Sequence, residues 1–378
     1  MSQENISAGN GADGGAPRGR FDINMPALKR FLRRVGIGAI PVFLGMCLIG
    51  YYAIEVRCNL TGDLGKLGKI QFGPEYQVRT YPLAYPDTLV VWYPHCGHTH
   101  RVGVIGDSFA YQYPSGFAAA LGHELADTVD VYTLSSQSYS PVQAAVDLVK
   151  SDFFEKHPQV KTVIVESVER MLVHRWADVD FNKENKMPVL KSRVPVMLGT
   201  SEQHLQSQLS ALQKETIDWV KLSSKICDSP VRSIPLKQKV FSHDEMGSQL
   251  YFYYNDLSSK ATPDRLQAVR TNVERLHGLF AAKGVEMIMM ISPDKYEVYQ
   301  HFAADNPYEP IVLSAQLSET LAGLDYVVNP TEAVTRLVAS GEQDVYYLND
   351  SHWSPKGARV AGAMLAEKMR GQSSEVEK

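Results

Sequence analysis

The feature that most constrains the fold is an alternation of short apolar strands with helices in two separate stretches of the chain. The predicted strands are residues 101–106, 128–134, 161–167, 285–291, 325–328 and 345–348. The predicted helices are residues 115–126, 140–156, 262–284 and 354–369. This order predicts an α/β fold in which a parallel sheet is flanked by helices on both faces. In such sheets, functional residues lie at the carboxyl ends of the strands.

The interval 172–260 interrupts the alternation. It contains a predicted helix at 201–225 and a tyrosine-rich run, QLYFYYND, at 249–256. We interpret the interval as an insertion into one domain that spans residues 89–372. The insertion fits two roles, a lid or substrate wall and a structural elaboration of the fold.

The N-terminal region predicts a membrane anchor. Residues 1–34 combine a polar, Gly-rich start with a basic cluster, which predicts disorder, whereas residues 35–54 carry no charge. The length of this apolar run matches a bilayer core, and the basic flank places residues 1–34 in the cytoplasm. We therefore expect one transmembrane helix at 35–54 and a neck at 55–88. A cleaved signal peptide and a buried helix of a soluble domain are the alternatives.

The net charge and the cysteine content limit which classes of partner and cofactor we expect. A net charge of −4 without a basic, aromatic-rich stripe argues against nucleic acid as a partner. Beyond the apolar run, Cys58, Cys96 and Cys227 would face an oxidising compartment and allow one disulfide, whose pairing the sequence leaves open. No cysteine or histidine spacing indicates a metal site, and we expect neither metal nor cofactor.

The strand at 101–106 runs into Gly-Asp-Ser, which places Ser108 just beyond its carboxyl end. A nucleophilic serine needs a histidine base, and that histidine needs an orienting carboxylate. The C-terminal sequence NDSHW offers Asp350 and His352, with Trp353 beside them, in a loop before the last helix. Because this loop can lie at the same sheet edge, we predict a triad of Ser108, His352 and Asp350.

Other residues at this edge are candidates for supporting roles. An oxyanion hole needs converging N–H groups, which the Ser108 backbone and the loop 135–140 can supply. Arg170 fits saccharide binding or orientation of the site, but also a structural pair with a glutamate. Lys295 fits a cleft wall or a solvated loop, and Asp107 is expected to brace the turn. The candidates for oxyanion or substrate binding are Asp107, Arg170, Lys295 and Trp353.

Four stretches together resemble the SGNH hydrolase superfamily, whose sheet is flavodoxin-like. They are GDSFA at 106–110, VESVER at 165–170, PDKYEVY at 293–299 and YYLNDSHW at 346–353. The combination is similar to the branch of periplasmic polysaccharide O-acetyltransferases typified by the alginate acetylation proteins J and X. The resemblance covers about residues 89–369. Ordinary SGNH esterases carry Asp-x-x-His and a Gly-x-Asn-Asp block, whereas this chain has Asp-x-His-Trp and ESVER.

The resemblance implies a single-pass protein of the bacterial inner membrane with its catalytic domain in the periplasm. It would move an acetyl group, through an ester on Ser108, onto hydroxyls of an exported polysaccharide. A multi-spanning membrane-bound O-acyltransferase is the implied acetyl donor. The alternatives are an esterase with the same triad, D-alanyl transfer onto teichoic acid, and a non-catalytic polysaccharide-binding subunit.

Overall fold

The computed structural model describes residues 25–59, 62–68, 70, 89–92, 101–112, 116–132, 140–183, 229–257 and 261–376. Two compact units divide the chain, Met1–Val56 and Arg57–Lys378. The predicted apolar segment 35–54 lies within helix α1 (Met25–Asn59). Among the residues described, no helix combines the length and the apolar character that a membrane crossing requires, so the predicted transmembrane helix is not supported.

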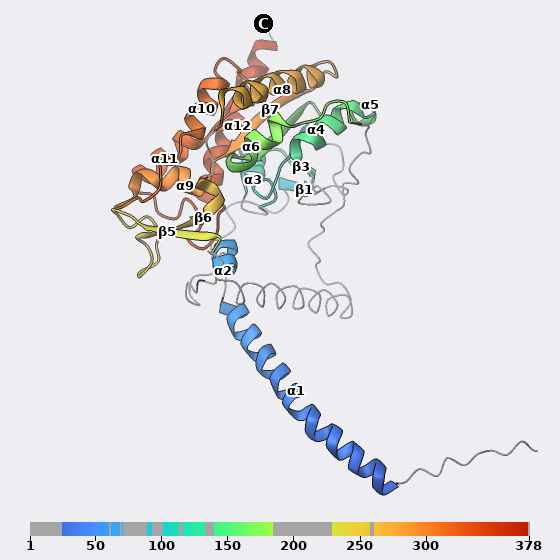
Figure 1. The fold of residues 1–378 in the computed structure, drawn as a ribbon. Coiled ribbons are helices and arrows are strands. Elements are labelled where there is room, and N and C mark those ends of the chain that lie inside the picture. The colour runs from blue at the N-terminus through green and yellow to red at the C-terminus, as the bar shows by residue number, and fades with distance from the viewer. Residues whose placement is uncertain are drawn as a thin grey trace, which may run out of the picture. The chain divides into compact units, whose positions relative to one another are not determined.

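The second unit is built on a six-stranded parallel sheet in the order β1-β3-β2-β4-β7-β8 (Figure 1). Its strands are β1 (Val90–Trp92), β2 (Val102–Ile105), β3 (Val129–Tyr132), β4 (Thr162–Val168), β7 (Glu286–Ser292) and β8 (Val327–Val328). The chain passes from β2 to β3 and then returns to the other side of β2 to form β4. This reversal creates a topological switch point between β2 and β4, the usual place for a site in an open α/β sheet.

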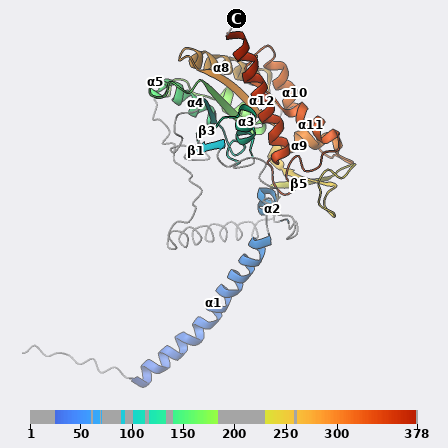
Figure 2. The ribbon, with the colours of Figure 1, turned by 180° about the vertical axis from the view of Figure 1, so that it is seen from behind.

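Helices cover the sheet in two groups (Figures 1 and 2). The first group pairs α3 (Phe117–Leu125) with the C-terminal α12 (Pro355–Val376). The second group consists of α4 (Pro141–Lys150), α6 (Glu169–Ala177) and α8 (Pro263–Ala281), which contact one another. Since both faces are covered, β4 and β7 are buried along nearly their whole length, and their side chains form the centre of the core. The predicted α/β class is confirmed.

Two predicted elements differ in detail. The helix predicted at 140–156 is interrupted after α4 and resumes as α5 (Phe153–Lys156). The cause is Ser151, whose hydroxyl donates to Leu148 O at 2.7 Å and accepts from Phe153 N–H at 3.1 Å, in competition with the helical pattern. The predicted strand at 345–348 does not join the sheet and forms only an isolated bridge between Tyr346 and Trp353.

The described part of the interval 172–260 contains an antiparallel pair, β5 (Val231–Pro235) and β6 (Gln249–Tyr253), followed by the 3₁₀ turn η2 (Tyr254–Leu257). The tyrosine-rich run supplies β6, in which buried Leu250 and Phe252 alternate with the partly exposed Tyr251 and Tyr253. The helix predicted at 201–225 lies outside the described residues.

The neck at 55–88 contains a short helix that the sequence did not predict, α2 (Gly62–Gly68). The other helical elements after β7 are α9 (Lys295–Tyr299), η3 (Gln300–Phe302), α10 (Leu313–Thr320) and α11 (Thr331–Ala339). Cys96 and Cys227 lie outside the described residues, so the disulfide stays a prediction and its pairing stays open.

Candidate active site

Ser108 stands on a tight turn directly after β2. Glycine is required at position 106, because a Cβ there would lie 2.4 Å from Glu166 Oε2 and 2.6 Å from Ala110 Cβ. The turn closes when Ala110 N–H donates to Asp107 O at 3.1 Å and Tyr111 N–H donates to Ser108 O at 3.3 Å. This backbone course leaves Ser108 exposed at the carboxyl end of β2.

Asp107 ties this turn to the neighbouring strand. Its Oδ1 accepts Phe109 N–H at 3.1 Å, and its Oδ2 accepts Val168 N–H at 2.9 Å. The Arg175 guanidinium donates to the same Oδ2. Burial alone would raise the pKa of Asp107, but the Arg175 charge and these hydrogen bonds outweigh burial and lower it. Asp107 therefore braces the turn as an anion, and its carboxylate is not available to a substrate.

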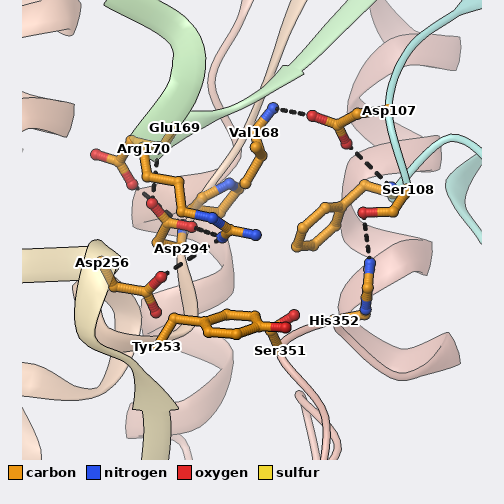
Figure 3. Close-up of polar contacts among 12 residues, drawn as sticks. Asp107, Ser108, Val168, Glu169, Arg170, Tyr253, Asp256, Asp294, Ser351 and His352 are labelled. Atoms are coloured by element: carbon orange, nitrogen blue, oxygen red, sulfur yellow. Dashed lines mark hydrogen bonds and ion pairs between the residues drawn. The ribbon is translucent and has the colours of Figure 1, made fainter. Parts of the chain in front are cut away.

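The three predicted catalytic residues meet beside this turn, and Figure 3 shows the contact between Ser108 and His352. His352 Nε2 lies 2.7 Å from Ser108 Oγ, and His352 Nδ1 lies 2.5 Å from Asp350 Oδ1. The backbone N–H of His352 also donates to Asp350 Oδ1 at 3.1 Å. Nucleophile, base and orienting carboxylate thus form one hydrogen-bonded series, the arrangement of serine-dependent acyl transfer.

The charges in this series support its chemistry. Burial would lower the pKa of His352, but the hydrogen bond to Asp350 and the charges of Asp350 and Asp63 outweigh burial and raise it. Burial would raise the pKa of Asp350, but the bond and charge of His352 lower it instead. A proton taken from Ser108 would therefore reside on His352 beside an ionised Asp350.

Asp63, in α2, is a member of the site that the sequence analysis missed. Its backbone N–H donates to Asp350 Oδ2 at 3.1 Å, and its Oδ1 accepts Ser351 N–H at 2.7 Å. Its Oδ2 accepts from the Ser351 hydroxyl and lies 3.7 Å from His352 Nδ1. No local motif marks Asp63, because its partners lie almost three hundred residues away in the chain.

Arg170 lies on the opposite side of the site, at the start of α6. Its guanidinium pairs through Nη1 with Asp294 and with Asp256, the latter at 3.5 Å, so Arg170 forms a structural pair whose partners are aspartates and not the predicted glutamate. Its backbone N–H donates to Asp294 Oδ2 at 2.7 Å. Within the described part of the chain, Nη2 bonds no acceptor, and the head group points toward the side where Ser108 lies (Figure 3).

Tyr253, from β6, packs under this arginine, with the Arg170 Cζ 5.3 Å from the centre of its ring. The hydroxyl of Tyr253 donates to Asp63 Oδ2 at 3.3 Å. The interval 172–260 therefore contributes at least one side chain to the wall of the site, which favours the substrate-wall interpretation over a purely structural elaboration.

Two predicted binding residues lie in the core instead. Lys295 is 0 % exposed, and its ammonium donates to the carbonyls of Tyr347, Leu348 and Asp350 at 2.7, 2.9 and 3.2 Å. Burial lowers the pKa of Lys295 to about 7. Trp353 is also 0 % exposed and packs edge-on against Phe109, with ring centres 5.0 Å apart. Both residues pack beneath the loop that carries Asp350 and His352, and neither lines a cleft.

The oxyanion hole has one visible donor. Among the described residues, the Ser108 backbone N–H has no hydrogen-bond acceptor, so it is available to an acyl oxygen. The loop 135–140, predicted to supply a second donor, lies outside the described residues except for Ser140. The head group of Arg170 points toward the same space (Figure 3).

Asp63, Asp350 and His352 also form a group with metal-binding side chains, because one ligand atom from each lies within 4.8 Å of the others. Those atoms are engaged with one another and with Ser351 by the hydrogen bonds described above. The donor set thus fits a hydrogen-bonded triad, and no step of the chemistry below depends on a metal.

Comparison with protein families agrees with the geometry. Residues 246–378 match the family model for the SGNH hydrolase-like domain of acetyltransferase AlgX. The matched part includes Asp350 and His352, whereas Ser108, Asp63 and Arg170 precede it. No curated protein matches the chain. The predicted resemblance is confirmed, and an enzymatic role related to acetyl transfer is supported.

Proposed function

We propose that this protein is a serine-dependent O-acetyltransferase that acts through an acyl ester on Ser108. The observation that carries the proposal is the hydrogen-bonded series Ser108–His352–Asp350 at the switch point of a parallel sheet. The similarity of residues 246–378 to an acetyltransferase domain supports acetyl as the transferred group.

In the first half-reaction, Ser108 Oγ attacks the carbonyl carbon of an acetyl donor while His352 Nε2 takes its proton. Asp350 stabilises the imidazolium that forms. The negative oxygen of the tetrahedral intermediate receives a hydrogen bond from Ser108 N–H and faces the positive head group of Arg170. The intermediate then collapses, the bond to the donor's leaving group breaks, and His352 returns the proton to that group. Acetyl-Ser108 remains.

In the second half-reaction, an acceptor hydroxyl takes the leaving group's place. His352 removes its proton, the hydroxyl oxygen attacks the ester carbon, and the bond to Ser108 Oγ breaks as Ser108 recovers a proton from His352. The product is an O-acetylated acceptor and free enzyme. Tyr253 and Arg170 lie across the site from His352 (Figure 3), and we propose that the acceptor approaches from their side.

The setting of this reaction follows from the family resemblance. We propose that the acceptor is an exported polysaccharide, that the reaction takes place in the bacterial periplasm, and that a multi-spanning membrane-bound O-acyltransferase supplies the acetyl group. Attachment of the chain to the inner membrane stays a prediction from the sequence alone.

An esterase is the second candidate, because Ser108 is exposed and water can reach the ester. The full chain, a chromogenic acetyl ester and a soluble polysaccharide distinguish the two. A transferase places acetyl on the polysaccharide, measured by mass spectrometry of released oligosaccharides, and the esterase yields only free acetate. The Ser108→Ala and His352→Ala variants should lose transfer, whereas Ser340→Ala and His174→Ala, at exposed positions, should retain it. Transfer that survives in Ser108→Ala would contradict the proposal and favour a non-catalytic role.

A further inference from the structure

We propose that Asp63 is a positioning residue of the triad: the segment before the sheet supplies a second carboxylate that holds Asp350 and His352 in their reactive arrangement. The inference rests on the proposed function and adds a residue to its machinery. It assigns a role to the neck, for which the sequence predicts only a connection.

The first argument is the pattern of hydrogen bonds. Asp350 uses Oδ1 for His352 and Oδ2 for the backbone N–H of Asp63, so both of its oxygens are fixed. Between Asp350 and His352, Ser351 donates both its backbone N–H and its hydroxyl to the Asp63 carboxylate. Each of the three consecutive residues 350–352 therefore faces Asp63. Removal of the Asp63 side chain would free Ser351 of both hydrogen bonds.

The second argument is how α2 itself is anchored. Gly62 has φ +71°, and a Cβ there would lie 2.0 Å from Asn349 O, so only glycine allows this approach. The same carbonyl accepts Leu64 N–H at 3.1 Å and Gly65 N–H at 3.2 Å. Leu64 is fully buried. The backbone of α2 is thus joined to the residue directly before Asp350, which sets the position of Asp63 with little freedom.

The third argument is electrostatic. The Asp63 Oδ2 lies 3.7 Å from His352 Nδ1, and its charge helps to raise the pKa of His352. The charged groups around His352 are Asp350 and Asp63, which favour the imidazolium, and Arg170, which opposes it. Tyr253 and Lys295 face Asp63 from β6 and α9. Asp63→Asn keeps the size of the side chain, removes its charge and replaces one acceptor oxygen by an amide NH2 group, and it should lower the pKa of His352.

The test uses the full chain in four forms: wild type, Asp63→Asn, Asp63→Ala and Asp244→Asn. Asp244 is a matched control, because its side chain is 99 % exposed on the surface. For each form, NMR gives the pKa of His352, the p-nitrophenol burst from p-nitrophenyl acetate gives the acylation rate, and thermal unfolding checks the fold.

We expect Asp63→Asn to lower the His352 pKa and to shift the acid limb of the acylation rate to lower pH. Asp63→Ala should in addition slow acylation by about 10- to 100-fold, because small misplacements of catalytic groups have effects of this size. If Asp63→Ala fails to fold, the Asn variant decides alone. Slower acylation with an unchanged His352 pKa would overturn the proposal, since loss of any structural contact would explain it.

The two proposals fail separately. Absence of an acyl adduct in the wild type would overturn the acyltransferase function. An unchanged pKa of His352 in Asp63→Asn would overturn the role of Asp63 whether or not the wild type is acylated.

Discussion

In the proposed mechanism His352 controls when Ser108 can react, because only the neutral imidazole accepts the serine proton. Its two carboxylate neighbours favour the protonated form and raise its pKa above the ordinary value of about 6.5. In the proposed acyl transfer the same neighbours would stabilise the imidazolium. We therefore expect His352 to favour the transition state and the activity to fall at low pH.

We predict that the acylation rate of Ser108 falls as the pH drops through the pKa of His352, with a midpoint above about 6.5. Asp350→Asn should move this midpoint to lower pH and reduce the maximal rate by about 10²- to 10⁴-fold, the usual contribution of a well-placed base. Stopped-flow measurement with p-nitrophenyl acetate gives both quantities. A midpoint that stays in place in Asp350→Asn would show that another group titrates.

Glu166, behind the Ser108 turn, gives a prediction about stability. It is fully buried, its Oε2 accepts Asp107 N–H at 2.8 Å, and burial and the charge of Asp107 raise its pKa well above the ordinary range. The folded state thus holds a proton that the unfolded chain releases above about pH 4.3. This contribution is complete at lower pH and is lost as the pH rises toward the folded-state pKa.

Glu166→Gln imitates the protonated acid and removes this dependence. The free energy of unfolding of the variant should exceed that of the wild type increasingly as the pH rises above about 5, by at most about 1.4 kcal/mol per pH unit. Urea unfolding between pH 5 and about 8 measures the difference. A difference that shrinks with pH would mean that Glu166 is ionised in the folded protein.

The turn after β2 is the element on which the site depends most. Its glycine has no space for a side chain, whereas Gly278, within α8, has no atom within 4 Å of a built Cβ. We predict that Gly106→Ala destabilises the protein by about 1–3 kcal/mol, as overpacking does, and slows acylation of Ser108. Gly278→Ala should stabilise it by about 0.5–1 kcal/mol. Effects of the same sign in urea unfolding would contradict this account of the turn.

The sequence predicts the elements whose signal is local. β4 contains the apolar run 163–165, β7 contains the apolar run 287–291, and α8 has apolar residues at helical spacing, so the sheet and the Ser108 position could be predicted. The segment 345–348 is apolar and aromatic, as strands often are, but the Lys295 ammonium binds the carbonyls of Tyr347 and Leu348. Those groups are then not available to a sheet ladder, and no local pattern reports this.

Side-chain direction is the second limit of the sequence. Lys295 follows a strand at the expected edge, yet its ammonium turns inward to the catalytic loop. Asp63 lies in a Gly-rich stretch without a motif, and only the folded chain brings it to Asp350. Both cases depend on contacts between distant segments. The triad itself was predictable because its chemistry needs particular residue types at a particular sheet edge.

The chain divides into two units, with the boundary after Val56 in the sequence. The triad and Asp63 lie entirely in the second unit. The domain predicted from the sequence starts at residue 89, which excludes α2. The structure places the functional boundary earlier, since α2 contributes hydrogen bonds to both Asn349 and Asp350.

Truncation tests this boundary. A chain that begins at Arg57 should keep the acylation rate and the thermal stability of the second unit, because it retains α2. The acylation rate of a chain that begins at Leu89 should fall by about 10- to 100-fold or more, because misplacement of the triad has effects of this size. Equal rates for the two truncated chains would place the boundary at residue 89 after all.

The central claim is that Ser108 carries the acyl group, and its mass tests this most directly. The full chain is mixed with p-nitrophenyl acetate, quenched in acid within the burst and digested, and the peptide containing Ser108 is examined by mass spectrometry. We predict a mass increase of one acetyl group on Ser108 that is absent in Ser108→Ala, nearly absent in His352→Ala and retained in His174→Ala. An unmodified Ser108 in the wild type, or an adduct that persists undiminished in His352→Ala, would contradict the account.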